Sequence, residues 1–229
     1  MKFISIIIML VLGACSQTSQ KNIQSNKDTL VKIKNNSTKH VVKYYPLEKK
    51  LLIGDFDGDG KTDTLYQNNI NSETSLPIDS LPELEEWDDI ISYLDQNYSN
   101  IIITSSKNKA DTLHLGAGFG LFCLINLGDL NHDKKDEFAF VTENADYSRV
   151  NHCYIYSICN KKFIQLKSFY IHEGSFDSYD NLIPKQNEIA NFLEKQNGKW
   201  MYMDYLDDMA YENEKDVGKF KVLKLNKCK

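Results

Sequence analysis

The feature that most constrains the fold is a succession of short runs of β-branched and aromatic residues. Runs of this kind are typical of β-strands. They occur at residues 40–45, 101–105, 119–127, 137–143, 152–158, 162–171 and 218–225. Asn197-Gly198 separates two further runs within residues 191–205, which predicts a tight hairpin. A second hairpin is predicted with its turn at 160–162, so the chain is expected to be mainly β.

One segment has helical periodicity instead. Within residues 81–96 the apolar positions fall on one face of a helix: Leu84, Trp87, Ile90, Ile91 and Leu94. Ser80 and Glu83 have the spacing of a capping box, and Pro82 falls in the first turn, where proline is tolerated. We expect a helix over 81–96 that packs against the strands.

The N-terminal segment is expected to direct export. Lys2 precedes a short apolar run from Phe3 to Leu12, which is typical of a secretory signal and too short to span a bilayer as a stable helix. The tetrad Leu12-Gly13-Ala14-Cys15 resembles a bacterial lipobox. That resemblance implies that Cys15 becomes the lipidated N-terminus after cleavage. An ordinary signal peptide with an incidental cysteine is the alternative.

These features divide the chain into three parts. Residues 1–14 are predicted to be the signal peptide, and 15–38 the lipidated cysteine followed by a flexible, polar tether without aromatic residues. Residues 39–229 are long enough for a single β-rich domain with a sizeable core. The net charge of −5 and the single arginine, Arg149, argue against a nucleic-acid partner.

Cysteine usage leaves the redox state open. Four cysteines remain beside Cys15, and they allow three pairings: Cys123, Cys153, Cys159 and Cys228. In one strand, Cys153 and Cys159 would lie on the same face about 20 Å apart, too far to pair. Buried free thiols are the alternative to disulfides.

An acidic segment at residues 51–67 carries the clearest chemical signal. It places Asp55, Asp57, Asp59 and Asp63 within nine residues. Calcium takes six to eight oxygen ligands, and a tight loop can present oxygens from alternate residues to one centre. The predicted ligands are these four carboxylates and the backbone carbonyl of Lys61. Gly60 stands where the loop must turn with positive φ.

The segment departs from an EF-hand in two respects. The twelfth loop position, which would be a bidentate glutamate, is Tyr66, and the flanks 50–54 and 63–67 have strand character. The segment resembles instead the DxDxDGxxD hairpin loops of FG-GAP/VCBS-type repeat proteins.

A second copy of this loop occurs at 126–140 and aligns with residues 52–66. Its predicted ligands are Asp129, Asn131, Asp133 and Glu137, with the carbonyl of Lys135. Lys134 stands in place of Gly60, and a left-handed conformation there costs a non-glycine residue roughly 1–2 kcal/mol. We therefore expect the first loop to bind calcium more tightly. A polar turn that holds no metal is the alternative for each loop.

The two loops also bear on architecture. They begin 74 residues apart, at Asp55 and Asp129, which is longer than one propeller blade of about 40–50 residues. A closed propeller needs four to eight blades. We expect a compact or incomplete β-propeller-like fold with the helix inserted between its repeats, and a β-sandwich is the alternative.

The sequence offers no catalytic motif. The glycines of residues 115–122 (LGAGFGLF) lack GxGxxG spacing and precede a strand, so they are expected to permit a bulge or close backbone packing. HExxH, GxSxG and CxxC do not occur. The protein is predicted not to be an enzyme.

The resulting hypothesis is a calcium-binding, lipid-anchored protein of the cell envelope that acts as a binding module. One alternative comes from resemblance to periplasmic lipoproteins that inhibit lysozyme-like wall hydrolases as immunity proteins. Another is a glycan-binding or adhesion module. Ser16 replaces the aspartate of inner-membrane retention, and residues 16–27 lack an acidic cluster resembling the surface-export tag of some Bacteroidetes lipoproteins. The expected location is the outer membrane, facing the periplasm.

Overall fold

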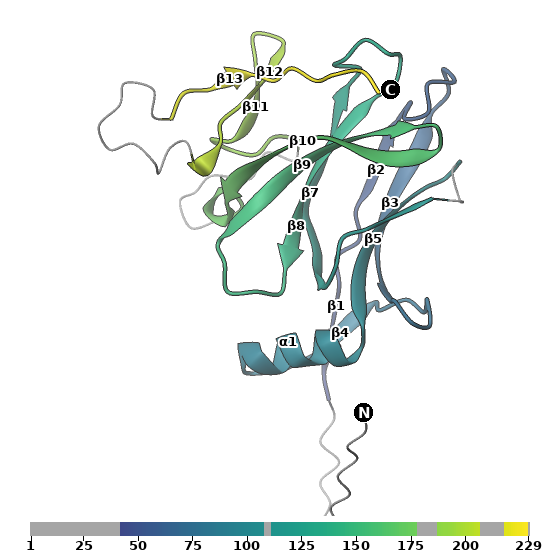
Figure 1. Cartoon of the computed structure of the whole chain (residues 1–229). Helices are drawn as coiled ribbons and strands as arrows, with labels where there is room; N and C mark the ends of the chain where they lie inside the picture. The colour runs from purple at the N-terminus through teal and green to yellow at the C-terminus, as the bar shows by residue number, and fades with distance from the viewer. Residues whose placement is uncertain (1–41, 108–110, 178–186, 207–217, 229) are drawn as a thin grey trace, which may run out of the picture. The chain divides into compact units, whose positions relative to one another are not determined.

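The computed structural model of the chain describes residues 42–107, 111–177, 187–206 and 218–228 (Figure 1). The predicted signal peptide, Cys15 and the tether lie outside these residues, as does the start of the predicted strand at 40–45. Within the described ranges, no helix has both the length and the apolar character needed to cross a membrane.

The described chain is mainly β and forms four antiparallel sheets. The first sheet has the order β2 (Leu51–Gly54), β3 (Asp63–Asn71), β5 (Ser99–Ser105) and β6 (Thr112–His114). The second has the order β7 (Gly118–Gly128), β8 (Glu137–Asn144), β9 (Val150–Cys159) and β10 (Lys162–His172). Strands of each large sheet therefore lie side by side in the order in which the chain reaches them.

Two smaller sheets complete the structure. The third sheet consists of β11 (Leu193–Gln196), β12 (Lys199–Tyr202) and β13 (Lys221–Val222). In the fourth, β1 (Tyr44–Pro46) pairs with β4 (Ser80–Pro82). The strand predicted at 218–225 is thus reduced to two residues, and β6 was not predicted.

Both predicted hairpins are confirmed. β11 and β12 pair across Asn197-Gly198, and β9 and β10 pair across Asn160-Lys161. All four turn residues have positive φ, between 49° and 78°. This conformation matches the right-handed twist of the flanking strands, which is why asparagine and glycine are favoured in such turns.

The predicted helix begins later than expected. α1 spans Trp87–Gln96, and Glu86 is its N-cap residue without a capping side-chain hydrogen bond, so the capping box predicted for Ser80 and Glu83 is wrong. Residues 80–82 form β4 instead, where Leu81 is buried and pairs with Tyr45. Strand pairing and burial of Leu81 outweigh the local helical preference.

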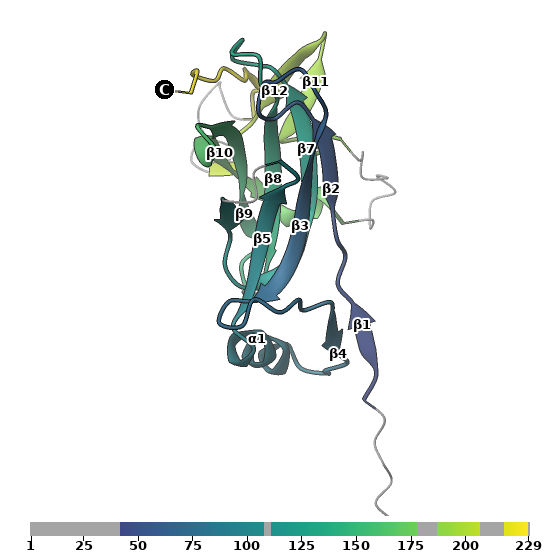
Figure 2. The same ribbon diagram turned by 90° about the vertical axis from the view of Figure 1, so that its right-hand side faces the viewer.

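The position of the helix also differs from the prediction. α1 and β4 lie in the connection between β3 and β5, within the first sheet rather than between the two repeats. Figures 1 and 2 show α1 beside β1 and β4, near the start of β5.

The second sheet is buried on both faces. One core cluster packs Phe138 and Phe140 of this sheet against Leu65 and Ile101 of the first sheet. The other packs Val141 and Ile155 of the same sheet against Leu193 and Trp200 of the third sheet and against Leu223, which follows β13. Consequently β8 is buried at six consecutive residues instead of alternating. Sheets stacked in this way are compatible with the β-sandwich alternative.

The cysteines combine both expected states. Cys159 at the end of β9 forms a disulfide with Cys228, across 69 residues of sequence. Cys123 and Cys153 are free and buried in the core. Burial raises the pKa of the Cys123 thiol to about 12, which keeps this thiol protonated and unreactive at neutral pH.

Candidate metal centre

The two acidic loops occupy equivalent places in the two large sheets. Loop one, residues 55–62, joins β2 to β3, and loop two, residues 129–136, joins β7 to β8. Gly54 pairs with Asp63 across the first hairpin, and Gly128 pairs with Glu137 across the second. Strand pairing therefore reproduces the alignment of the two loops inferred from sequence.

Their backbones also follow the same course. Asp55 Oδ2 accepts a hydrogen bond from the backbone nitrogen of Gly60 (2.9 Å), and Asp129 Oδ2 accepts one from that of Lys134 (3.1 Å). Lys134 has the left-handed conformation predicted for it, with φ 74° against 76° for Gly60. His132 in loop two also has a positive φ, of 60°, and the aligned residue of loop one is Gly58, with φ 78°. This second left-handed position was not predicted from the sequence.

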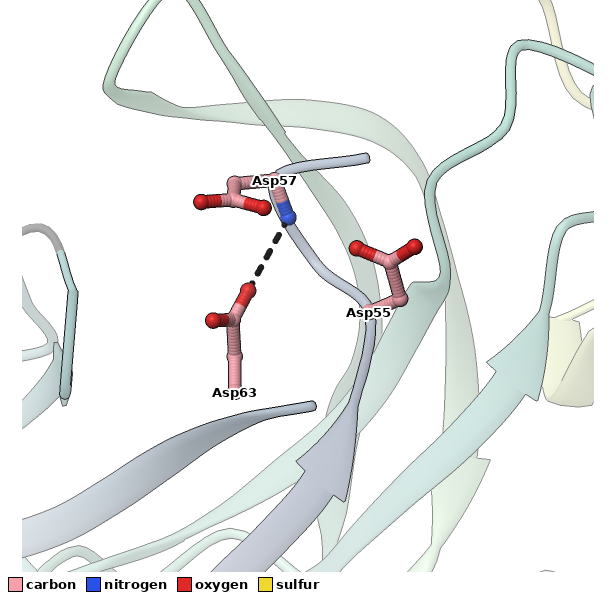
Figure 3. A group of neighbouring side chains, drawn as sticks. All are labelled: Asp55, Asp57 and Asp63. Atoms are coloured by element: carbon pink, nitrogen blue, oxygen red, sulfur yellow. Dashed lines mark hydrogen bonds between the residues drawn. The ribbon is translucent and has the colours of Figure 1, made fainter. Parts of the chain in front are cut away.

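Loop one brings three of its four carboxylates together. Asp55, Asp57 and Asp63 each offer an oxygen within 4.8 Å of the others (Figure 3). The Asp57 backbone nitrogen donates to Asp63 Oδ2 at 3.2 Å, as the dashed line shows. The other oxygen, Asp63 Oδ1, is buried, and its partner is the ammonium group of Lys107. A buried carboxylate oxygen is costly unless a cation or a hydrogen-bond donor replaces its water.

The ammonium group of Lys107 faces this oxygen. Lys107 Nζ lies 2.8 Å from Asp63 Oδ1, 2.8 Å from Asp59 Oδ1 and 3.9 Å from Asp57 Oδ1. Hydrogen bonds to Asp59 and Asp63 raise the pKa of Lys107 above its usual value. A positive charge therefore already sits among three carboxylates that were predicted to bind calcium.

Asp59 and Lys61 are placed differently from the other predicted ligands. Asp59 Oδ1 accepts hydrogen bonds from Lys107 Nζ and from the Lys61 backbone nitrogen, both at 2.8 Å. The bond from Lys107 is the main cause of the lowered pKa of Asp59. Lys61 itself is exposed. Asp59 is thus turned toward Lys107 rather than toward the group of three aspartates.

Loop two satisfies its polar groups internally. Glu137 is buried, and its two carboxylate oxygens accept from Asn131 Nδ2 (2.8 Å) and the Leu130 backbone nitrogen (2.9 Å). Burial is the main cause that raises the pKa of Glu137 to about 7. Asp133 accepts from the Lys135 backbone nitrogen at 3.2 Å. The amide of Asn131 thus gives Glu137, the first residue of β8, part of what a cation would supply.

The two loops are joined by direct hydrogen bonds. The Asp136 backbone nitrogen donates to the Asp55 carbonyl at 2.8 Å, and Asp136 Oδ2 accepts from the Asp55 nitrogen at 3.1 Å. Asn126 Nδ2 donates to Asp136 Oδ2 and to the Ile53 carbonyl. A Cβ on Gly54 would lie 2.5 Å from Asn126 Nδ2, so only glycine permits this approach. The position of Asp55 therefore depends on loop two.

Sequence reasoning missed Lys107, Asn126 and Asp136. Lys107 follows β5, and pairing of Leu65 with Ser105 brings it beside loop one. Because that pairing spans the inserted helix, no local pattern pointed to Lys107. Asp136 was visible as a further acid in loop two, but it has no counterpart in loop one, where Thr62 stands at the aligned position.

Loop one opens onto a depression of about 380 Å3. Asp57 and Asp59 line it together with Lys107, Lys135 and Lys161. The carboxylates of Asp57 and Asp59 are thus reachable from solvent, whereas Asp63 is buried. Hard oxygen donors in a tight loop are the ligand set that calcium prefers, so the residues present fit this ion.

Comparison with protein-family models, with curated protein sequences and with solved structures found no match. The interpretation of the site therefore depends on its own geometry and chemistry.

Proposed function

We propose that the protein binds calcium at loop one and acts as a lipid-anchored binding module of the cell envelope. The observation that carries the calcium proposal is the grouping of Asp55, Asp57 and the buried Asp63, which each offer an oxygen within 4.8 Å of the others. Calcium bound there would be held by Asp55, Asp57 and Asp63, with Asp59 and the Lys61 carbonyl from the exposed side of the loop. The ion would neutralise carboxylates that otherwise repel one another.

The envelope location is proposed from the lipobox-like tetrad that ends at Cys15 and from the polar tether that follows it. A periplasm-facing outer-membrane protein should resist protease added to intact cells and become sensitive after the outer membrane is opened. Digestion on intact cells would place it on the surface instead.

We also propose that the two large sheets are two blades of an incomplete propeller-like fold related to FG-GAP/VCBS repeats. Each is a four-stranded antiparallel meander whose first two strands are joined by an acidic loop in the same register. Contacts between β2 and β7, the first strands of the two sheets, support this interpretation. An experimental structure with an angle between the sheets typical of a sandwich would contradict it.

Calorimetric titration of the full chain with calcium tests the site. Asp59→Ala should remove most of the calcium binding. Asp55→Ala should do so too. Each variant also removes hydrogen bonds, since Asp55 accepts from Gly58 and Gly60, and Asp59 accepts from Lys61 and Lys107. Heat of binding that is unchanged in both variants would refute the site.

The same titration ranks the two loops. Asp129→Ala should change calcium binding less than the loop-one variants, because loop two satisfies Glu137 through Asn131. Lys134→Gly should strengthen the second site, since it relieves the left-handed conformation of Lys134. Loss of the tighter site in Asp129→Ala, with that site intact in Asp55→Ala, would reverse the ranking.

A further inference from the structure

A second candidate site lies away from the two loops. It consists of two depressions, of about 380 Å3 and 330 Å3, that share Phe119 and Glu143 in their walls. The first is bounded by β1, β4 and α1, and includes Tyr45 and Leu81. The second is bounded by α1 and the connection between β8 and β9, and includes Trp87. Together they are called the Phe119 cleft.

A β-bulge places Phe119 in this cleft. The register of β7 against β8 shifts between Gly118 and Gly120, which makes Phe119 the additional residue. A Cβ on Gly118 would lie 2.5 Å from the Glu143 carbonyl oxygen, so the strands approach as only glycine permits. The glycines of 115–122 thus have the role expected of them. Bulges often redirect a side chain beside a functional site.

Aromatic side chains form the open walls of the cleft. The Phe119 ring lies 5.4 Å from that of Trp87, measured between ring centroids. Trp87 is 37% exposed, Tyr45 is 44% exposed and Tyr147 is 73% exposed. Exposed aromatic faces attract cations as well as apolar groups.

The charged groups of the cleft leave an excess of negative charge. Glu143, Asp146 and Glu173 line the second depression together with a single cation, Arg149. Burial raises the pKa of Glu143 and of Glu173, while Lys50 opposes the rise at Glu143 and a hydrogen bond from Asn151 opposes it at Glu173. Glu143 makes no hydrogen bond or ion pair through its carboxylate to any described residue. The nearby cations form their ion pairs with other residues: Lys50 pairs with Glu48 at 2.9 Å and Arg149 with Asp177 at 2.5 Å, although Lys50 also lowers the pKa of Glu143 through its charge.

We propose that the Phe119 cleft binds an arginine side chain of a partner protein. The guanidinium would pair with Glu143 and Glu173, and its flat face would stack on Trp87 and Phe119. Arginine fits this site better than lysine, because a planar guanidinium both stacks on aromatic rings and pairs with carboxylates through several donors. The inference rests on the binding-module part of the proposed function and is independent of the calcium site.

Tryptophan fluorescence provides the test, since the chain has only two tryptophans. Trp87 lies in the cleft, whereas Trp200 is buried and donates its indole N–H to the Leu127 carbonyl. The probe is acetyl-Gly-Arg-Gly-amide, titrated into the full-length protein with calcium and with EDTA. The matched control peptide carries citrulline, which has the shape of arginine without its charge.

The arginine peptide should give a saturable fluorescence change that the citrulline peptide does not give. Glu143→Gln and Glu173→Gln should each weaken binding by about tenfold, as expected on loss of one charged hydrogen-bonding partner. Glu73→Gln, an exposed position in the turn after β3, should have no effect.

Three results would overturn the proposal. They are the absence of a saturable change, an equal response to citrulline, and stronger binding of diacetylchitobiose, which would assign the cleft to a glycan. Calcium binding is measured separately by the calorimetric titration, so failure of the cleft and failure of the calcium site give separate results.

Discussion

Replacement of Asp63 by asparagine tests the calcium site most directly. The substitution keeps the size of the side chain and leaves one oxygen to accept from the Asp57 nitrogen. It replaces the buried Oδ1, which pairs with Lys107, with an NH2 group that cannot bind a cation. The loop can therefore keep its course while the ion loses one buried, charged ligand.

The size of the calcium-induced increase in stability follows from linkage between binding and folding. At calcium a hundredfold above the Kd, binding adds about 2.7 kcal/mol to the free energy of unfolding. For a domain of this size that raises the Tm by about 5–11 °C. Loss of one charged contact costs on the order of 1.5–3 kcal/mol and weakens binding by about ten- to a hundredfold. The remaining stabilisation is then about 0.4–1.4 kcal/mol, so the Asp63→Asn variant should lose about half or more of the calcium-induced shift.

The assay is thermal unfolding of each protein with EDTA and with calcium. Only the difference between the two conditions is compared, because Asp63→Asn also removes a partner of Lys107 and lowers the Tm without calcium. Glu73→Gln controls for loss of an acidic residue outside the loop. A full calcium-induced shift in Asp63→Asn, equal to that of the unaltered protein, would refute the assignment of Asp63 as a ligand.

Three further predictions follow from contacts elsewhere in the described chain. Lys107→Met should tighten calcium binding several-fold by calorimetry, because the ion then need not displace the ammonium from Asp59 and Asp63. Lys61→Met, which removes a charge from loop one itself, should not, and equal effects of the two variants would argue against competition. The raised pKa of Glu143 means that the folded state holds this proton to higher pH than the unfolded state. The free energy of unfolding therefore falls as the pH rises above the unfolded pKa of about 4.3, and Glu143→Gln should reduce this fall. Identical profiles of Tm between pH 4 and 8 would contradict this. Replacement of Cys159 and Cys228 by serine should lower the free energy of unfolding by roughly 4 kcal/mol, the chain-entropy value for a loop closed across 69 residues; urea midpoints that coincide with those of the oxidised protein would show that the disulfide does not constrain the unfolded chain.

Local patterns predicted most of the strands correctly. β7 to β10 match the predicted runs closely, because each run combines β-branched and aromatic residues with turn residues at its end. The predicted start of α1 was wrong for a non-local reason. Residues 80–82 pair with β1, and this pairing competes with the helical periodicity of the local sequence. Single-sequence patterns do not register a partner strand that lies far away in the chain.

The candidate site was predictable to a similar extent. The alignment of the two loops identified the paired positions Asp63 and Glu137, which strand register confirms. The neighbours that distinguish the loops were not predictable. Lys107 lies beside loop one only because β3 pairs with β5. Asn131 was predicted from the sequence to be a metal ligand, whereas in the structure its amide donates to Glu137.

The sheet of β7 to β10 has a consequence for how the protein unfolds. Phe138 and Val141 on β8 belong to different cores, so neither core can open without uncovering the sheet they share. Amide hydrogens of β8 should therefore exchange only when the whole domain opens. Calcium bound at loop one would then slow exchange in the third sheet as well, although no residue of that sheet is among the proposed ligands. The ion and the C-terminal strands would respond as one cooperative unit.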